Sequence, residues 1–431
     1  MIWPYQSDLT GSDITKQHLL TKTAAALLTA ATLSITAGAA QAGFRTESTL
    51  VSPAVTPYEG KYTSVQWQTD KAENIGVPVT YGESVLLPSG SGVLRLAEEN
   101  GLELASVKLP EEICTEYSGV MSGDILIQPT ASGLCTIDFT SGTVTAHKSF
   151  GGSVDSDVAL IDGLAYFSVK DGDSESFCCA DTSDMSLKWQ YTAQADITSA
   201  TVQGDYVIFG AGKNLVTCHY KDGTVCEIPL DSEVTSAPFA TEYAVFFAMG
   251  GSTAKLRLNS DGTYEDDTLT LCETGENTAA PVVYNSKLYT VSDSGFHILD
   301  SLNMEITHTL SEITGGSDPI VTYGTGTRIY TVGKYQDRWA LYCVFDASEE
   351  HEPTSTTLAG LDDFTGGRVS TSAEGTMYFR DAHGRLFAVT RVAYSILNIV
   401  LKLVVLLAII VGVFIWLKLV AKRREDLYPK Y

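Results

Sequence analysis

A four-stranded unit recurs along most of this chain of 431 residues. Each unit has an extended start, a second strand, a turn, a third strand that usually closes on a polar residue, a turn and a fourth strand. The closing residue of the third strand recurs at Ala97, Asp138, Asp181, His219, Asn259, Asp300, Asp346 and Thr390, at spacings of 38 to 46 residues. Four-stranded units with a period of about 40 residues are typical of β-propeller blades.

The two ends of this array complement each other. The eighth unit shows only three strands, at 369–371, 377–379 and 386–390, before a long apolar segment begins. Residues 65–69 (VQWQT) stand alone before the first full unit, and they match the fourth strand at 188–192 (KWQYT). Closing a ring removes exposed sheet edges. We therefore predict an eight-bladed β-propeller whose N-terminal strand completes the last blade, with seven blades as the alternative if one weak unit is miscounted.

The segments outside the repeats predict where the protein lies. An Ala/Leu/Thr run follows Lys22 and leads to Ala40-Gln41-Ala42, which predicts a signal peptide over residues 1–42. Residues 43–62 would then form a leader before a propeller ectodomain over 63–391. Near the other end, 403–417 is uninterrupted apolar sequence, which predicts a transmembrane helix over 392–420.

Basic residues set the expected orientation of that helix. Four Lys or Arg residues lie at 418 and 422–424, and by the positive-inside rule they place a tail over 421–431 in the cytoplasm. The expected localisation is the cell membrane, as a single-pass protein with its propeller on the extracytoplasmic side.

The net charge of the chain limits the classes of partner that it is expected to bind. The chain has 28 Lys and Arg, 52 Asp and Glu, and a formal net charge of −24. Removing the two acids and two bases of residues 1–42, and the two acids and six bases of residues 392–431, leaves 48 acids and 20 bases, a net charge of −28 for residues 43–391. A nucleic-acid partner is not expected, because Lys and Arg supply most of that affinity. Cations or a partner with a basic face are favoured.

The repeats have a recognisable internal order. Several units open on a residue followed by proline, at 77–78, 237–238, 280–281 and 318–319, and third strands read GLCTID (133–138) or GFHILD (295–300). A fourth strand can carry tryptophan, as at 187–192 (LKWQYT). Over about residues 64–390 this order resembles the repeat of the pyrroloquinoline-quinone-type (PQQ-like) β-propeller family. The resemblance implies the propeller fold, and it raises the alternative of a quinoprotein dehydrogenase that uses PQQ and calcium.

Cys178-Cys179 bears on that alternative, because quinoprotein alcohol dehydrogenases use an adjacent-cysteine disulfide against the quinone. Here the pair falls inside a predicted third strand rather than in a cofactor-facing loop. The calcium ligands, the catalytic Asp and the Trp platform of those enzymes have no identifiable counterparts. We therefore expect no enzyme activity and no cofactor, and we assign no catalytic, cofactor-binding or metal-binding residue.

Two other cysteines suggest a cross-strand disulfide. If Lys221-Asp222-Gly223 is a three-residue hairpin loop, Cys218 lies directly opposite Cys226, close enough in principle to form a disulfide. Cys135 and Cys343 occupy a recurrent apolar position and are expected as buried thiols.

The expected role follows from the predicted localisation and the predicted fold. Propellers bind through the loops on their two faces and through the central channel. Almost no linker separates the last strand from the membrane helix. We therefore expect a non-enzymatic binding or scaffolding module for a membrane-proximal protein.

Overall fold

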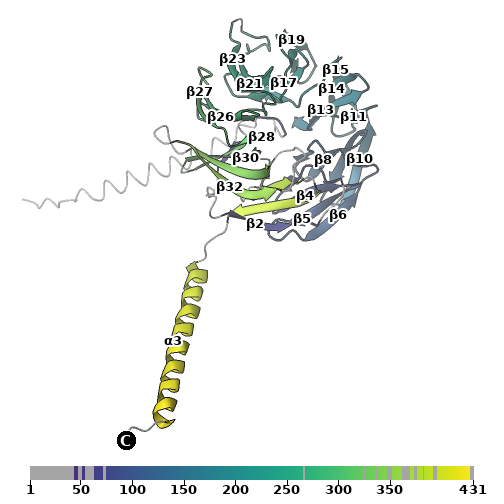
Figure 1. The fold of residues 1–431 in the computed structure, drawn as a ribbon. Helices are drawn as coiled ribbons and strands as arrows, with labels where there is room; N and C mark the ends of the chain where they lie inside the picture. The colour runs from purple at the N-terminus through teal and green to yellow at the C-terminus, as the bar shows by residue number, and fades with distance from the viewer. Residues whose placement is uncertain are drawn as a thin grey trace, which may run out of the picture.

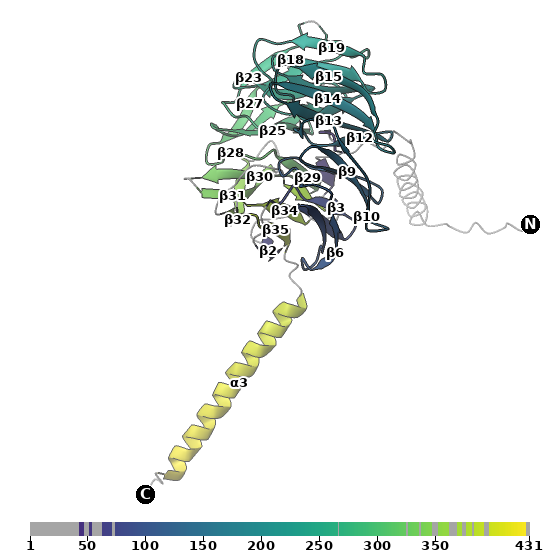
Figure 2. The same cartoon turned by 90° about the vertical axis from the view of Figure 1, so that its right-hand side faces the viewer.

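The computed structural model describes residues 43–46, 51–53, 63–70, 74–265, 267–324, 326–335, 338–346, 352–361, 369–372, 376–381, 383–391 and 396–427. The predicted signal peptide and the last four residues of the predicted tail lie outside these ranges. The strands form eight sheets, which follow one another around a ring (Figure 1 and Figure 2). The chain is therefore an eight-bladed β-propeller, as predicted, and the seven-bladed alternative is wrong.

The first four blades share an up-and-down order of four strands, to which blade 3 adds the short strand β11, paired with β13 beside β12. Blade 1 holds β3 (Val79–Tyr81), β4 (Ser84–Ser89), β5 (Gly92–Ala97) and β6 (Glu103–Lys108). Blade 2 holds β7 (Val120–Ser122), β8 (Ile125–Pro129), β9 (Gly133–Asp138) and β10 (Thr143–Ser149). Blade 3 holds β11 (Ser153–Val154), β12 (Ala159–Ile161), β13 (Leu164–Asp171), β14 (Ser174–Asp181) and β15 (Leu187–Ala193). Blade 4 holds β16 (Thr201–Gln203), β17 (Tyr206–Ala211), β18 (Asn214–His219) and β19 (Val225–Pro229).

The last four blades repeat this order with additions in blade 7. Blade 5 holds β20 (Phe239–Ala240), β21 (Val245–Met249), β22 (Ser252–Leu256) and β23 (Thr270–Glu273). Blade 6 holds β24 (Val282–Tyr284), β25 (Lys287–Ser292), β26 (Gly295–Asp300) and β27 (Ile306–Leu310). Blade 7 holds β1 (Val51–Pro53), β28 (Thr314–Gly316), β29 (Ile320–Gly324), β30 (Gly326–Tyr335), β31 (Arg338–Asp346) and β32 (Thr354–Leu361). Blade 8 holds β33 (Ser370–Thr371), β34 (Met377–Arg380), β35 (Leu386–Arg391) and β2 (Thr63–Gln68).

The hydrophobic core lies between neighbouring blades. Second and third strands such as β4 and β9 are almost continuously buried, whereas the outer strand β10 is mostly exposed. Between blades 1 and 2, for example, Leu86 and Val93 pack with Leu126 and Ile137. Each blade thus buries both faces of its middle strands, which explains their near-continuous apolar sequence rather than strict alternation.

The ring closes through its two sequence ends, as predicted. β2 pairs antiparallel with β35, with Ser64 opposite Thr390 and Val65 opposite Val389. We call this pairing the seam. Two predicted strand ends shift slightly, because the third strand of blade 5 ends at Leu256 and that of blade 8 at Arg391.

Tryptophans on outer strands pack against turns of the next blade. Trp67 of β2 donates its indole N–H to the carbonyl of Glu98 at 2.7 Å, and Trp189 of β15 donates to the carbonyl of Tyr220 at 3.1 Å. Each ring covers a glycine with a positive φ, Gly101 or Gly223. A Cβ at Gly101 would lie 2.6 Å from the Trp67 ring. The recurrent glycine therefore makes room for the tryptophan.

The strand directions divide the ring into two faces. First strands start on the face where the chain passes from one blade to the next, which we call the connection face. First and second strands, and third and fourth strands, are joined on the opposite face. β35 is a third strand, so it ends on that opposite face. We call it the tether face, because the chain continues from it to the helix α3 (Ile396–Leu427).

Helix α3 extends away from the ring (Figure 1). Its segment Leu403–Val420 has a mean hydropathy of 2.9, with none of it buried. Among the described residues α3 is the one helix long and apolar enough to cross a membrane. It runs beyond the predicted boundary at residue 420 and includes the basic residues of the predicted tail. Pro429, which disfavours a helical conformation in the residue before it, follows two residues after it ends.

Candidate binding site at the mouth of the central channel

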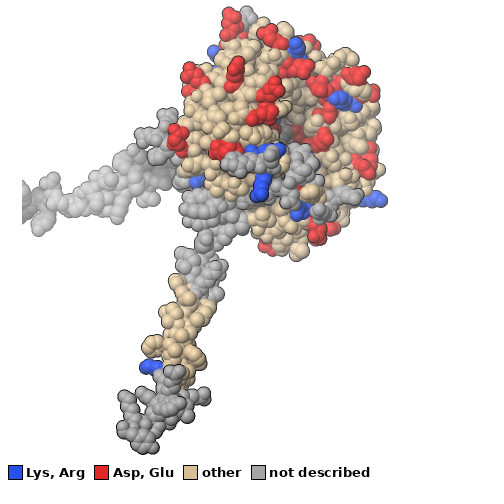
Figure 3. Space-filling model, in the orientation of Figure 1, with Lys and Arg blue, Asp and Glu red and all other residues tan. Residues whose placement is uncertain are grey.

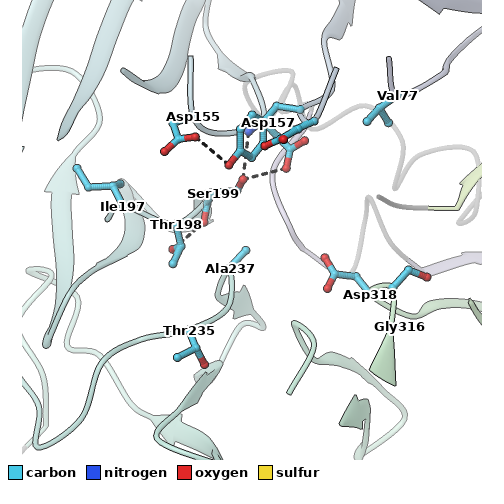
Figure 4. Close-up of a pocket in the computed structure, with 13 residues that line it drawn as sticks. Val77, Asp155, Asp157, Ile197, Thr198, Ser199, Thr235, Ala237, Gly316 and Asp318 are labelled. Carbon is cyan, nitrogen blue, oxygen red and sulfur yellow. Dashed lines mark hydrogen bonds between the residues drawn. The ribbon is translucent and has the colours of Figure 1, made fainter. Parts of the chain in front are cut away.

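The residues just before the first strands surround a cavity of about 310 Å³ on the connection face (Figure 4). In five blades the lining includes the residue two positions before β3, β12, β16, β20 or β29, namely Val77, Asp157, Ser199, Ala237 and Asp318. The other lining residues are Glu116, Tyr117, Asp155, Ile197, Thr198, Thr235, Gly316 and Ser317. The ring repeat therefore brings residues from sequence positions 77 to 318 to one site.

The lining is acidic and rich in hydroxyl groups. It carries Glu116, Asp155, Asp157 and Asp318, and none of its described residues is Lys, Arg or His. Acidic side chains also outnumber basic ones on the face of the molecule that Figure 3 shows. Such a cavity favours a cationic group over an anionic one.

Hydrogen bonds fix the carboxylates on one side of the cavity. Asp157 accepts bonds from the backbone N–H and the hydroxyl of Ser118, both at 2.8 Å, and from the Ser199 hydroxyl at 2.9 Å. These bonds join blades 2, 3 and 4. Tyr117 donates its hydroxyl to Asp155 at 3.1 Å, and burial raises the pKa of Tyr117, so its hydroxyl remains a donor at neutral pH.

A buried arginine lies on the other side. Arg45 is fully buried, and its Nη1 contacts Asp318 Oδ2 at 2.7 Å while Nη2 donates to the carbonyl of Ala280 at 3.3 Å. Burial lowers the pKa of Arg45, and the charge and hydrogen bond of Asp318 oppose that effect. The Asp318 side chain is 26% exposed and also lines the cavity. Asp318 therefore faces both the buried arginine and the open space.

Arg45 belongs to a short segment that occupies the channel, Gly43–Thr46, which we call the channel plug. The Phe44 ring is buried and packs 5.8 Å from the Tyr166 ring. The Arg45 carbonyl accepts the Thr201 hydroxyl at 2.6 Å and the backbone N–H of Ala240 at 3.2 Å. Phe44 and Arg45 of the plug thus contact blades 3 to 7.

This role of the leader is not predictable from the sequence. The sequence predicts residues 43–62 as a leader between the signal peptide and the ring, but the plug packs inside the ring and β1 pairs in parallel with β29 of blade 7. A short segment without periodicity gives no strand or helix signal. The available hint was Asp318, a charged residue directly before a proline, where other units with that proline have Val77, Ala237 or Ala280.

The predicted register of Cys218 and Cys226 is wrong. The structure pairs Cys218 with Val225 and Cys226 with Thr217. The loop spans residues 220–223 instead of 221–223, because the backbone N–H of His219 bonds to the carbonyl of Thr224. Cys218 therefore packs between blades 3 and 4 and Cys226 between blades 4 and 5, and both are free thiols.

The adjacent pair Cys178-Cys179 lies in β14, a third strand, as predicted. Its two side chains point into different inter-blade cores, and both thiols are free. Burial raises the pKa of Cys178 to about 12 and that of Cys179 to about 11. Cys135 and Cys343 are also buried and free, as expected.

Comparison with known proteins shows a similarity of fold. No family model matches the chain, and no curated protein matches it in sequence. A quinohemoprotein alcohol dehydrogenase from Comamonas testosteroni superposes with a TM-score of 0.56 at 9% identity, over 78% of this chain and 77% of that one. These chains share a propeller fold.

A computationally designed protein, Ika8, superposes with a TM-score of 0.53 at 11% identity, over 79% of this chain and 98% of the designed one. At such identities the likeness concerns the fold alone, and the site must be interpreted from its own residues.

Proposed function

We propose that the chain is a membrane-anchored, extracytoplasmic propeller that acts as a non-enzymatic binding module, and that its acidic cavity receives a basic group of a protein partner. The observation that carries this proposal is the cavity itself, which gathers four carboxylates and several hydroxyls from blades far apart in sequence. Carboxylates and hydroxyls held by a rigid scaffold recognise Lys or Arg side chains through charge-assisted hydrogen bonds. The hydrogen bonds at Asp157 hold part of this surface in place before a partner arrives.

Membrane attachment is part of the same proposal. Helix α3 has the length and hydropathy of a transmembrane span, and the basic residues after it favour a cytoplasmic C-terminus. The cavity opens on the connection face, whereas the chain leaves the ring on the tether face. A partner that reaches the cavity therefore approaches from the side away from the helix, even if the partner itself is anchored in the same membrane.

The order of the repeats supports a relationship to the PQQ-like propellers, but the cavity does not fit PQQ. PQQ carries several carboxylates, which four lining carboxylates would repel. The described residues contain no group of three His, Cys, Asp or Glu placed to hold a metal ion. Cys178 and Cys179 lie in inter-blade cores. These observations favour a binding role over a dehydrogenase.

Site-specific photo-crosslinking in cells tests the binding role. A photoreactive residue in place of Thr235, in the cavity, is expected to capture a protein partner. The E116Q/D155N double variant is expected to reduce that capture at least tenfold, because it removes two lining charges. The matched control D205N/E242Q removes two exposed charges from the tether face and should leave capture unchanged. Equal capture by the E116Q/D155N variant and the unmodified chain would refute an acidic recognition site.

The dehydrogenase alternative has its own test. Purified full-length protein in detergent is mixed with PQQ and calcium and assayed for dye-linked alcohol oxidation. We expect neither PQQ binding nor oxidation, and measurable oxidation would overturn the non-enzymatic assignment.

A further inference from the structure

We propose that the acidic cavity also holds the chain's own mature amino terminus, the α-ammonium group of Gly43. This inference rests on cleavage after Ala42, which the sequence predicts, and not on the partner of the proposed function. Cleavage there would turn the backbone nitrogen of Gly43 from an amide into a charged amine. The plug would then begin with a cation at the wall of a cavity lined by carboxylates.

The position of Gly43 is the first observation. Gly43 has a φ of 79°, and a Cβ on it would lie 2.4 Å from the carbonyl oxygen of Val158 and 3.3 Å from Cγ2 of Val120. Gly43 therefore passes between the first strands of blades 2 and 3, where only glycine fits. Val158 directly follows Asp157, a cavity-lining residue. The residue after the predicted cleavage site thus lies against the residue that follows a cavity-lining carboxylate.

The direction of the plug is the second observation. Thr46 forms a parallel bridge with Ala240 of β20. First strands run from the connection face toward the tether face, so the plug runs the same way. Its N-terminal end therefore points toward the connection face, where the cavity opens.

The charges around this end agree with that placement. Arg45, the cation of the plug, bonds to Asp318 on the other side of the cavity. Asp155, Asp157 and Glu116 line the part of the cavity that belongs to blades 2 and 3, and Gly43 lies against Val158, the residue after Asp157. Carboxylates within a few ångströms stabilise an ammonium group, and recognition of an N-terminal amine by a concave polar site is a known binding mode.

Cleavage after Ala42 would thereby become a step in the maturation of the ring. Before cleavage the nitrogen of Gly43 belongs to a neutral amide. After cleavage the α-ammonium anchors the end of the plug, and Arg45 anchors its middle. Phe44 and Arg45 would then be held from both sides.

Amine labelling of purified full-length protein in detergent, without any partner, tests the inference. Near pH 7 a reagent selects α-amines, whose pKa is about 7.7–8.0, over lysines at about 10.4. Mass spectrometry of the N-terminal peptide should find Gly43 first in the chain. Its amine should label at least tenfold more slowly in the native protein than in denaturant, because the carboxylates hold it protonated and enclosed.

Two variants that lack acidic side chains of the cavity distinguish ion pairing of the Gly43 amine from its simple burial. E116Q/D155N and D157N should each raise the native labelling rate at least threefold, and E116Q/D155N covers the case in which D157N disturbs folding. D205N/E242Q on the tether face should leave the rate unchanged. The proposal would be overturned if the chain began at a residue other than Gly43, or if the amine labelled as fast in the native protein as in denaturant. It would also be overturned if native labelling were slow and neither acid variant changed its rate.

Discussion

At the scale of single residues, Arg45 connects the leader to the ring. A guanidinium with no exposed surface loses its hydration, and the Asp318 carboxylate with the Ala280 carbonyl replaces only part of it. The two partners are not equivalent, because Asp318 also touches the open cavity while Arg45 does not. Removing one partner should therefore have a different consequence from removing the other.

We predict that D318N destabilises the propeller more than R45M does. D318N leaves a fully buried guanidinium without its counter-charge, a change that costs about 3–5 kcal/mol in buried ion pairs. R45M fills the same space with an apolar chain, and water in the cavity can solvate Asp318. Chemical unfolding of both variants in detergent measures the difference. A larger loss of unfolding free energy for R45M would contradict this account of the pair.

Glu175 gives the propeller a pH dependence. It is 1% exposed at the start of β14, and its Oε2 accepts the backbone N–H of Ile197 at 2.8 Å. Burial raises the pKa of Glu175 from 4.5 to about 7. The folded state thus keeps a proton that the unfolded chain releases near pH 4.5. The contribution of Glu175 to stability is therefore highest below pH 4.5 and declines as the pH rises to about 7.

We predict that E175Q removes this dependence. The melting temperature of E175Q relative to the unmodified protein should rise between pH 5 and pH 8, because glutamine stays neutral and can still accept the Ile197 N–H. D173N, an exposed substitution in the same hairpin, serves as the control and should show no such trend. A difference between E175Q and the unmodified protein that is constant with pH would refute the assignment.

At the scale of elements, regular burial was predictable from sequence and single-residue register was not. The apolar strands recur at a regular spacing, which predicts the blade count. The seam follows from the missing fourth strand of the last unit and from the match of residues 65–69 to residues 188–192. The hairpin after β18 differs, because Lys221-Asp222-Gly223 suits loops of three or four residues equally well. One extra residue, Tyr220, moves Cys226 to the other face of the sheet. The plug was unpredictable because its contacts come from five blades.

The tryptophan contacts permit a matched test at this scale. Gly101 and Gly142 both end the turn between third and fourth strands with positive φ, but only Gly101 lies under a tryptophan. We predict that G101A costs about 1–3 kcal/mol more than G142A, because its methyl group overlaps the Trp67 ring. Thermal unfolding of the two variants measures this difference. Equal losses of stability in the two variants would mean that backbone strain alone explains the glycine at position 101.

At the scale of the whole molecule, the two faces have different neighbours. The cavity opens on one face and α3 follows from the other. The strands of a blade are about six residues long, which separates the faces by about 20 Å. If α3 spans a bilayer, the tether face is the one nearer to the lipid.

We predict that this order can be measured in lipid nanodiscs. A fluorescent amino acid at position 205 on the tether face should be quenched more strongly by a headgroup-attached quencher than one at position 235 in the cavity. The reason is the separation of the two faces along the ring axis. Equal quenching, or stronger quenching at 235, would show that the ring lies on its side or is inverted.

The seam also has a mechanical consequence. If α3 spans a membrane, tension between the ring and that membrane enters at the Arg391 end of β35, where Thr63 is the partner on β2. β35 lies between β34 and β2, so a pull along its axis loads both hydrogen-bond ladders in parallel. Ladders loaded in this shear geometry resist force together, whereas a strand peeled from an edge gives way bond by bond. The pairing that closes the ring is therefore also the point at which it bears load.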